Sequence, residues 1–163
     1  MVIQTYEAQY RDQIIRLILQ IQCDEFQVSI TLDDQPDLLK IPQVYQRGTG
    51  NFWIALDRNQ VIGTIGLIDI GQTHAALRKM FVHSQYRGKM AGIGQALLDT
   101  LLQWSVEQHI SEIYLGTIEV FEAAQRFYQK NGFVEIQNYE LPEHFPVMAG
   151  DNKFYKYYSI NVL

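Results

Sequence analysis

The chain has 163 residues, of which 47% are hydrophobic and 19% are charged. This length and composition are typical of one globular domain and exclude a long disordered tail, so we expect a single domain over residues 1–163. The 13 basic and 18 acidic side chains give a formal net charge of −5. A protein with this charge is expected to repel a phosphate backbone, which excludes nucleic acid as a predicted partner.

The chain shows no sign of export or of a membrane span. Its longest apolar runs are short pieces such as Val61 to Ile70, and Met1 to Tyr10 lacks a basic region followed by an apolar stretch. The single cysteine, Cys23, cannot form an internal disulfide. We therefore expect a cytoplasmic protein with no membrane partner and with a buried or half-buried thiol.

The first third of the chain predicts one strand and two helical segments. Val2 to Tyr6 has a strand pattern, and Gln9 to Phe26 places its apolar residues at helical spacings of three and four. Gln35-Pro36-Asp37 then begins a second helical segment, which Pro42 interrupts. From Asn51 the period changes to two.

Three strands are predicted in the middle of the chain. Phe52 to Leu56 and Val61 to Ile70 flank the polar turn Asp57-Arg58-Asn59-Gln60, as in a hairpin, and Ala75 to His83 adds a third strand. The polar, glycine-bearing loop Ser84 to Ala91 follows.

The last part of the chain alternates helices and strands. The predicted helices are Gly92 to His109 and Val120 to Lys130, the second of which ends at Asn131-Gly132. The predicted strands are Ile113 to Leu115, Phe133 to Leu141 and Phe154 to Ile160. The order βααβββαβαββ predicts an α/β fold with a mixed central sheet flanked by helices, in which the strands of Ala75 and Leu115 are parallel.

The loop Ser84 to Ala91 combines features of an anion site. Small residues allow close approach to the backbone, and free N–H groups at the start of a helix attract phosphate, as do Arg87 and Lys89. A tight turn with solvated charges remains the alternative. The spacing after Gly92-Ile93-Gly94 does not fit a dinucleotide fingerprint, and no P-loop motif is present.

Two motifs resemble those of a known family. A strand, Tyr86-Arg87-Gly88-Lys89, Gly92-Ile93-Gly94 and an apolar helix together resemble the acetyl-CoA motif of the GNAT acetyltransferases. Ala123 to Phe133 is similar to that family's A-x-x-F-Y-x-K-x-G-F signature. The resemblance implies a GNAT fold and an N-acetyltransferase that moves the acetyl group of acetyl-CoA, its co-substrate, to a primary amine of a small molecule or protein. It implies direct attack in a ternary complex and no metal.

The same resemblance implies roles for individual residues. The implied cofactor-binding residues are Phe81, Val82, Arg87, Gly88, Lys89, Ala91, Gly92, Ile93, Gly94 and Gln95. Tyr128 is the implied donor of a proton to the departing thiolate. The alternative is that Tyr128 is a core aromatic residue, since Phe121, Ala124 and Tyr128 share one helical face.

Three departures separate the chain from the family pattern. Met90 and Ala91 lengthen the loop, Phe121 stands where relatives often have an asparagine, and Ala76 stands where some have a glutamate. The general base therefore stays open among Asp24, Glu25, Asp69, Glu119 and a water chain. A non-catalytic acyl-CoA-binding sensor on the same fold is the second hypothesis, and an interaction domain without ligand is the third.

The acceptor-binding segments of relatives correspond to Cys23 to Leu39 and Leu141 to Asp151. Their acidic residues favour a cationic amine, although an acidic loop is often merely solvated; they include Asp24, Glu25, Asp33 and Asp34. The histidines show no metal-ligand spacing; they are His74, His83, His109 and His144. One face of the aromatic run Phe154 to Tyr158 is a candidate homodimer contact.

Overall fold

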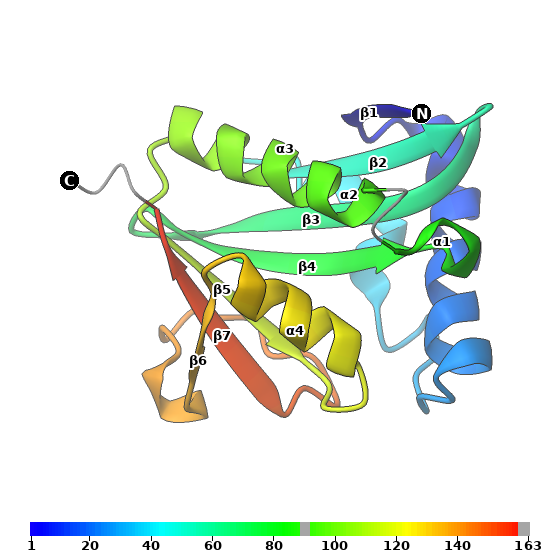
Figure 1. The fold of residues 1–163 in the computed structure, drawn as a ribbon. Coiled ribbons are helices and arrows are strands. Elements are labelled where there is room, and N and C mark those ends of the chain that lie inside the picture. Colours follow the sequence, from blue (N-terminus) through cyan, green and yellow to red (C-terminus); the bar gives the residue numbers. More distant parts are fainter. Residues whose placement is uncertain (89–91, 160–163) are drawn as a thin grey trace.

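A computed structural model describes residues 1–88 and 92–159 and contains a seven-stranded mixed sheet in the order β1-β2-β3-β4-β5-β7-β6 (Figure 1). The strands are β1 (Val2–Thr5), β2 (Asn51–Asp57), β3 (Gln60–Gly71), β4 (His74–Val82), β5 (Glu112–Thr117), β6 (Val134–Ile136) and β7 (Lys153–Tyr158). The helices are α1 (Arg11–Leu19), α2 (Ile41–Val44), α3 (Ile93–Glu107) and α4 (Glu122–Lys130). This succession confirms the predicted α/β fold. No helix in the described ranges is long and apolar enough to cross a membrane.

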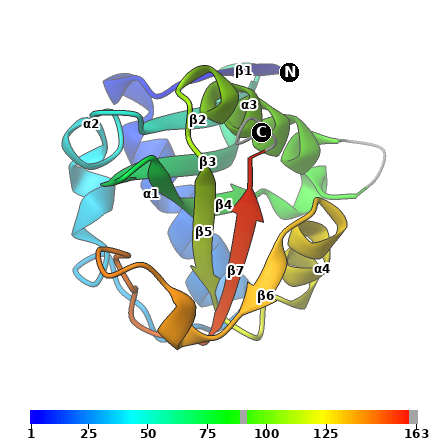
Figure 2. The same ribbon diagram turned by 90° about the vertical axis from the view of Figure 1, so that its left-hand side faces the viewer.

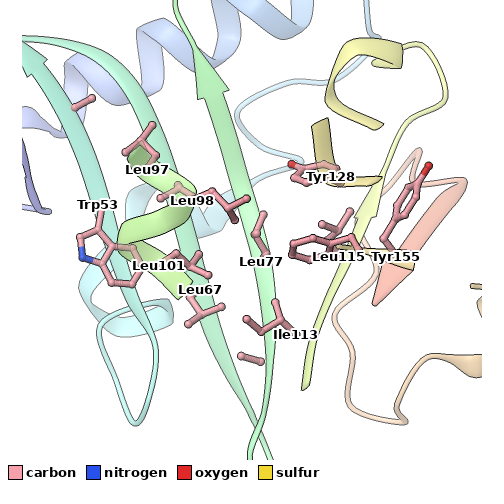
Figure 3. Packing of buried hydrophobic residues seen from close by; sticks show 14 of the residues in the cluster. Trp53, Leu67, Leu77, Leu97, Leu98, Leu101, Ile113, Leu115, Tyr128 and Tyr155 are labelled. Atoms are coloured by element: carbon pink, nitrogen blue, oxygen red, sulfur yellow. The ribbon is translucent and has the colours of Figure 1, made fainter. Parts of the chain in front are cut away.

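Helices cover both faces of the sheet (Figure 2). On the side of α3 and α4, Leu97, Leu98 and Leu101 are fully buried against the sheet in a cluster that reaches Trp53 (Figure 3). On the side of α1 and α2, the buried residues form a second cluster; its fully buried members include Ile14, Ile18, Leu38, Tyr45, Phe52 and Ile54. The two clusters fix the sheet between its helical layers, since apolar burial is the main stabilising term.

The two predicted N-terminal helical segments are both irregular. The segment predicted over Gln9 to Phe26 forms α1 and continues as a π-helical turn, Gln20–Glu25. The second consists of a 3₁₀ turn, Pro36–Leu39, and the short α2, so it is broken as predicted. π-Helical turns are often found at functional sites.

Two tight turns set the register of the central strands. Arg58 and Asn59 between β2 and β3 have φ values of +52° and +64°, and Gln72 and Thr73 between β3 and β4 have +56° and +62°. Two successive residues with positive φ are the signature of the turn whose twist matches antiparallel strands. Only β4 and β5 are parallel among the described strand pairs, as predicted.

The chain after α4 departs from the predicted long strand. Gly132, with a φ of +93°, ends α4, and the N–H of Phe133 donates to the carbonyl of Tyr128 at 3.0 Å. The strand predicted over Phe133 to Leu141 is only β6, which was therefore predicted too long. A 3₁₀ turn, Asn138–Glu140, follows because the Glu140 carboxylate accepts a 2.7 Å hydrogen bond from the Gln137 N–H.

Candidate active site

The parallel strands β4 and β5 lie side by side only at their start. Their paired residues are His74 with Glu112, Ala75 with Ile113 and Ala76 with Tyr114. Beyond Ala76 and Tyr114, β4 and β5 are no longer paired with each other, and they diverge (Figure 1). The second half of β4 therefore has backbone N–H and C=O groups on this edge without a strand partner, and these groups can bind an extended ligand.

A bulge lies in the half of β4 that is paired with β3 but not with β5. The register with β3 passes from Gly66 opposite Arg78 to Thr64 opposite Phe81, so β4 holds one extra residue here. Lys79 has a φ of +55°, and its carbonyl accepts a 2.6 Å hydrogen bond from Thr64 Oγ1. The bulge redirects the backbone just before Phe81, where the resemblance places the cofactor.

The Lys79 side chain joins a buried polar cluster on the α1 and α2 side of the sheet. Its Nζ donates to Gln35 Oε1 at 2.6 Å and lies 3.8 Å from Asp37 Oδ2. The Tyr45 hydroxyl donates to Asp37 at 2.6 Å, and Gln35 Nε2 donates to Gln22 Oε1 at 2.8 Å. Burial lowers the pKa of Lys79 to about 8, although the Asp37 carboxylate acts in the opposite direction.

The start of α3 has the geometry of an anion site. Gly88 and Gly92 have φ values of +111° and +63°, and no atom lies within 4 Å of the place where a Cβ would stand on either. No side chain of the described residues caps α3. The backbone N–H groups of Ile93, Gly94 and Gln95 are thus the free donors of a helix start. The predicted cofactor residues Lys89 and Ala91 lie outside the described residues.

Arg87 makes contacts that the sequence did not predict. Its Nη1 and Nη2 donate to the Glu25 carboxylate, the second at 2.9 Å to Oε1, and its Nε donates to the Val82 carbonyl at 2.7 Å. Its guanidinium also lies 5.8 Å from the centre of the Phe26 ring. Arg87 therefore connects the π-helical turn to the end of β4 and occupies the carbonyl of a predicted cofactor-binding residue.

Phe121 belongs to an aromatic cluster beside this ion pair. Its ring centre lies 4.8 Å from that of Phe26 and 6.4 Å from that of Phe81. Phe121 thus packs between the π-helical turn and β4. The side chain that stands in place of the asparagine of relatives has a packing role here.

The surroundings of Tyr128 are those of a core aromatic residue with a hydroxyl that is unpaired in the described part of the chain, and its role as a proton donor stays a prediction. It is only 5% exposed, and its ring centre lies 5.6 Å from that of Phe133 and 6.3 Å from that of Tyr155. Its hydroxyl has no hydrogen-bond partner among the described residues and points away from Tyr155, on the side of Leu77 (Figure 3). Burial raises the pKa of the Tyr128 phenol above its ordinary value. The ring belongs to the core, while the hydroxyl is free to donate.

Several predicted base candidates have structural partners. Glu25 binds Arg87, and the Asp69 carboxylate accepts hydrogen bonds from the N–H groups of Thr49 at 3.1 Å and Gly71 at 2.8 Å. Asp24 lines a cavity of about 360 Å³ beside His83. Asp34, an acidic residue of the predicted acceptor segment, accepts a 2.9 Å hydrogen bond from the Thr31 N–H.

A carboxylate that was not singled out as a base candidate, Asp151, lies close to β5. Its Oδ2 is 2.6 Å from where a Cβ on Gly116 would stand and accepts a 3.3 Å hydrogen bond from the Met148 N–H. Burial raises the pKa of Asp151, whereas the positive charges of Arg78 and Lys79 lower it. The sequence placed Asp151 only at the end of an acceptor segment.

The histidines do not form a metal site in the described ranges, where no three potential ligands lie together. His74 Nε2 lies 3.1 Å from Glu112 Oε2, and His83 Nδ1 accepts from the Gln85 N–H at 3.1 Å. Both side chains thus have structural partners.

The divergent strands, the β4 bulge and the uncapped helix start together define the candidate site of this α/β domain. The model of the Acetyltransferase (GNAT) family matches residues 15–133. The chain belongs to this family, which confirms the resemblance and, at the level of the family, the prediction of an acetyl-CoA-dependent acyltransferase.

Individual relatives agree with this assignment. An acetyltransferase of the GNAT family from Staphylococcus aureus Mu50 is 44% identical with a TM-score of 0.93, over 96% of this chain and 98% of that one. The fold is also that of the PaiA N-acetyltransferase from Thermoplasma acidophilum in complex with coenzyme A, which is 16% identical with a TM-score of 0.68 over 96% and 98% of the two chains.

Among curated relatives, the N-acetylaspartate synthetase of Xenopus tropicalis is 35% identical over 102 residues, 61% of this chain. The match covers 37% of that protein, and a match to N-acetyltransferase family 8 member 2 of Rattus norvegicus covers 55%. The chain thus spans about half or less of their length.

Proposed function

We propose that the protein transfers the acetyl group of acetyl-CoA to a primary amine of a small molecule or protein, by direct attack in a ternary complex. The observation that carries this proposal is the divergence of β4 from β5 beyond Ala76 and Tyr114, together with the uncapped start of α3. A strand edge can hydrogen-bond the amides of a pantetheine arm, and helix N–H groups can bind a pyrophosphate.

The proposed cofactor contacts are mostly backbone groups. The side chain of Ile93 is buried in the core, and Gln95 donates to Asp99 Oδ1 at 2.9 Å and to Asn131 Oδ1 at 2.8 Å. Their contribution is therefore assigned to the N–H groups. Arg87 and Lys89 add positive charge near the helix start. A fold neighbour in complex with coenzyme A supports this assignment, and no metal is included in the proposal.

When bound, acetyl-CoA supplies an acetyl thioester, and attack by an amine nitrogen on its carbonyl carbon forms the C–N bond, breaks the C–S bond and releases a proton and CoA. The backbone N–H of Val82, just after the bulge, is assigned to the carbonyl oxygen, where negative charge grows during attack. The neighbouring N–H of His83 donates to the carbonyl of Ile62 of β3, so in the alternation of the strand the N–H of Val82 points to the open edge and that of Phe81 to β3.

Tyr128 is assigned to the sulfur. A phenol has a pKa of about 10 and a thiol has a pKa of about 8.5, and burial raises the pKa of the Tyr128 phenol further. Complete proton transfer from Tyr128 to the thiolate is therefore unfavourable. The hydroxyl instead donates a hydrogen bond that stabilises the charge on sulfur as the C–S bond breaks.

A sensor that binds an acyl-CoA without turnover is the second candidate function. It is favoured by Phe121, which fills the place of the asparagine of relatives with an aromatic cluster, and by Ala76 in place of a glutamate. Steady release of CoA thiol in the presence of primary amines supports the transferase, whereas tight binding without release supports the sensor.

A thermal melt with acetyl-CoA tests the binding step shared by both. A ligand at a hundredfold excess over its Kd stabilises the folded state by about 2.7 kcal/mol. We expect a clear rise in Tm. No shift would leave the third hypothesis, an interaction domain without ligand.

A further inference from the structure

Arg78 projects from the sheet on the side of α1 and α2, just where β4 leaves β5. Residues two apart in a strand share a face, and Ala76, two residues earlier, packs with Tyr114. Gly66, directly opposite Arg78, faces the same side, because a Cβ on it would lie 2.7 Å from the Tyr45 ring. Arg78 is thus the first side chain of β4 on this face beyond the last pair with β5.

The Arg78 guanidinium is not engaged in direct contact with a carboxylate in the described part of the chain, although the charge of Asp151 acts on it from beyond ion-pair distance. The side chain is partly buried, yet it makes no hydrogen bond and no ion pair with any residue in the ranges 1–88 and 92–159. Its neighbour Lys79, in contrast, binds Gln35 and lies near Asp37. A guanidinium partly withdrawn from water favours a carboxylate, which it can bind through two parallel hydrogen bonds.

Asp151, in the loop before β7, places its carboxylate at the matching position over β5. Gly116 follows Tyr114 by two residues and shares its face, and the Asp151 carboxylate lies where a side chain of Gly116 would be. Asp151 Oδ1 has no partner in the described part of the chain, and no ion pair of 4 Å or less joins Asp151 to Arg78 there. One positive and one negative group therefore lie on the same face of the sheet, Arg78 on β4 and Asp151 over β5, and each has free hydrogen-bonding capacity.

The proposed position of the thioester, beside Tyr128, is on the other face of the sheet. Tyr128 packs in the cluster on the α3 and α4 side of the sheet, with Leu77 and Val82 of β4. Arg78 and Asp151 are charged groups on the α1 and α2 side that are available to an acceptor amine placed on that side. A zwitterion satisfies both groups at once, whereas an acceptor with positive charges alone would be repelled by Arg78.

We infer that the acceptor is a primary amine that also has a carboxylate, as a free amino acid does, with Arg78 binding its carboxylate and Asp151 its ammonium group. The inference rests on the proposed function, since it names the acceptor class for the same site. Asp151 also lies where it can take the proton that the ammonium must lose before its nitrogen attacks.

The test compares each amino acid with its carboxamide and with the amine that lacks the carboxyl group. The full chain, acetyl-CoA and each acceptor are mixed, and kcat/KM is measured from CoA release. We expect at least one amino acid to be acetylated about tenfold or more efficiently than its carboxamide, the scale of one lost charge-assisted hydrogen-bond pair.

Variants assign that preference to the two residues. Arg78→Met should abolish the preference for the amino acid over its carboxamide, because it lowers kcat/KM for the amino acid alone. Arg78→Lys, which keeps the charge, should retain part of the preference. Asp151→Asn should reduce transfer to acid and carboxamide alike, because both present the same ammonium group. The matched control is Arg47→Met, which removes an exposed arginine and should change neither. Circular dichroism confirms that each variant is folded.

The inference and the proposed function fail in different ways. The inference is overturned if amines without a carboxylate, such as carboxamides or diamines, are acetylated as well as amino acids or better, and if folded Arg78→Met and Arg78→Lys leave these rates unchanged. The proposed transferase activity would then still stand. Binding of acetyl-CoA without transfer to any amine overturns both.

Discussion

Arg87 and Glu25 form a bidentate ion pair although 62 residues separate them in the chain. The pair connects the π-helical turn after α1 to the loop that leads into α3. Arg87 is also a proposed phosphate ligand. A guanidinium whose donors already bind a carboxylate and the Val82 carbonyl has few left for a phosphate, so Glu25 should compete with the cofactor.

Glu25→Gln is therefore expected to tighten acetyl-CoA binding by about two- to fivefold, which corresponds to roughly 1 kcal/mol or less for a partly exposed pair. Isothermal titration measures the Kd. Arg87→Gln in the same background should cancel the gain, and Glu143→Gln, an exposed acidic control, should have no effect. If Glu25→Gln binds acetyl-CoA no better than the wild type, Arg87 is not a phosphate ligand.

Gly94 tests the anion site at the start of α3. A Cβ on Gly94 would lie 3.6 Å from Met80 and 3.8 Å from Val82, both ordinary contacts, so Gly94→Val should fold. Gly92→Val is less informative because Gly92 has a φ of +63° and any side chain there is strained. We expect Gly94→Val to weaken acetyl-CoA binding about tenfold or more at an unchanged Tm. Undiminished affinity would remove the helix start from the cofactor site.

The order of the elements was predictable because each one is defined by local patterns. The apolar period of α3 and the Asn131-Gly132 end of α4 are properties of neighbouring residues. The length of β6 was not predictable, since it depends on a hydrogen bond between Glu140 and Gln137 that competes with the strand. The bulge at Lys79 has no glycine to mark it and appears only in the pairing with β3.

The cofactor side of the site was indicated by motifs, but the acceptor side was not. Lys79 and Gln35 are 44 residues apart, and no spacing rule connects them. Arg78 and Asp151 lie on the same face of the sheet only because β4 and β5 are neighbours. The consecutive charged residues Arg78 and Lys79 inside a largely apolar strand pattern were a local signal that this face of β4 is unusual.

Lys79 predicts a specific dependence of stability on pH. Its folded-state pKa of about 8 is below its unfolded value of 10.5, so between these values the unfolded state binds more protons. The contribution of Lys79 to the free energy of unfolding should therefore be constant below pH 8. It should rise by up to about 3 kcal/mol as the pH increases from about 8 to 10.5. Urea unfolding at a series of pH values, compared with Lys79→Met, measures it. A difference between the two proteins that does not change with pH would contradict a lowered pKa.

Tyr128→Phe separates the two roles of this residue. The substitution keeps the ring that packs against Phe133 and removes only the hydroxyl, so the Tm and the acetyl-CoA affinity should be preserved. If the hydroxyl stabilises the leaving thiolate, kcat should fall by about 10²- to 10⁴-fold. Tyr155→Phe, in the same cluster, is the matched control and should keep kcat. Near-normal turnover in Tyr128→Phe would leave Tyr128 as a core residue alone.

The most direct test of the proposed activity is to count acetyl groups transferred per protein molecule. The full chain is incubated with acetyl-CoA labelled in its acetyl group and a pool of primary amines that includes amino acids, diamines and peptides, and the labelled N-acetyl product is quantified by mass spectrometry. We predict many transfers per molecule, with one CoA thiol released for each N-acetyl group formed. Acetyl-CoA that remains bound at no more than one per molecule, with no labelled amine formed, would contradict the transferase and support the sensor.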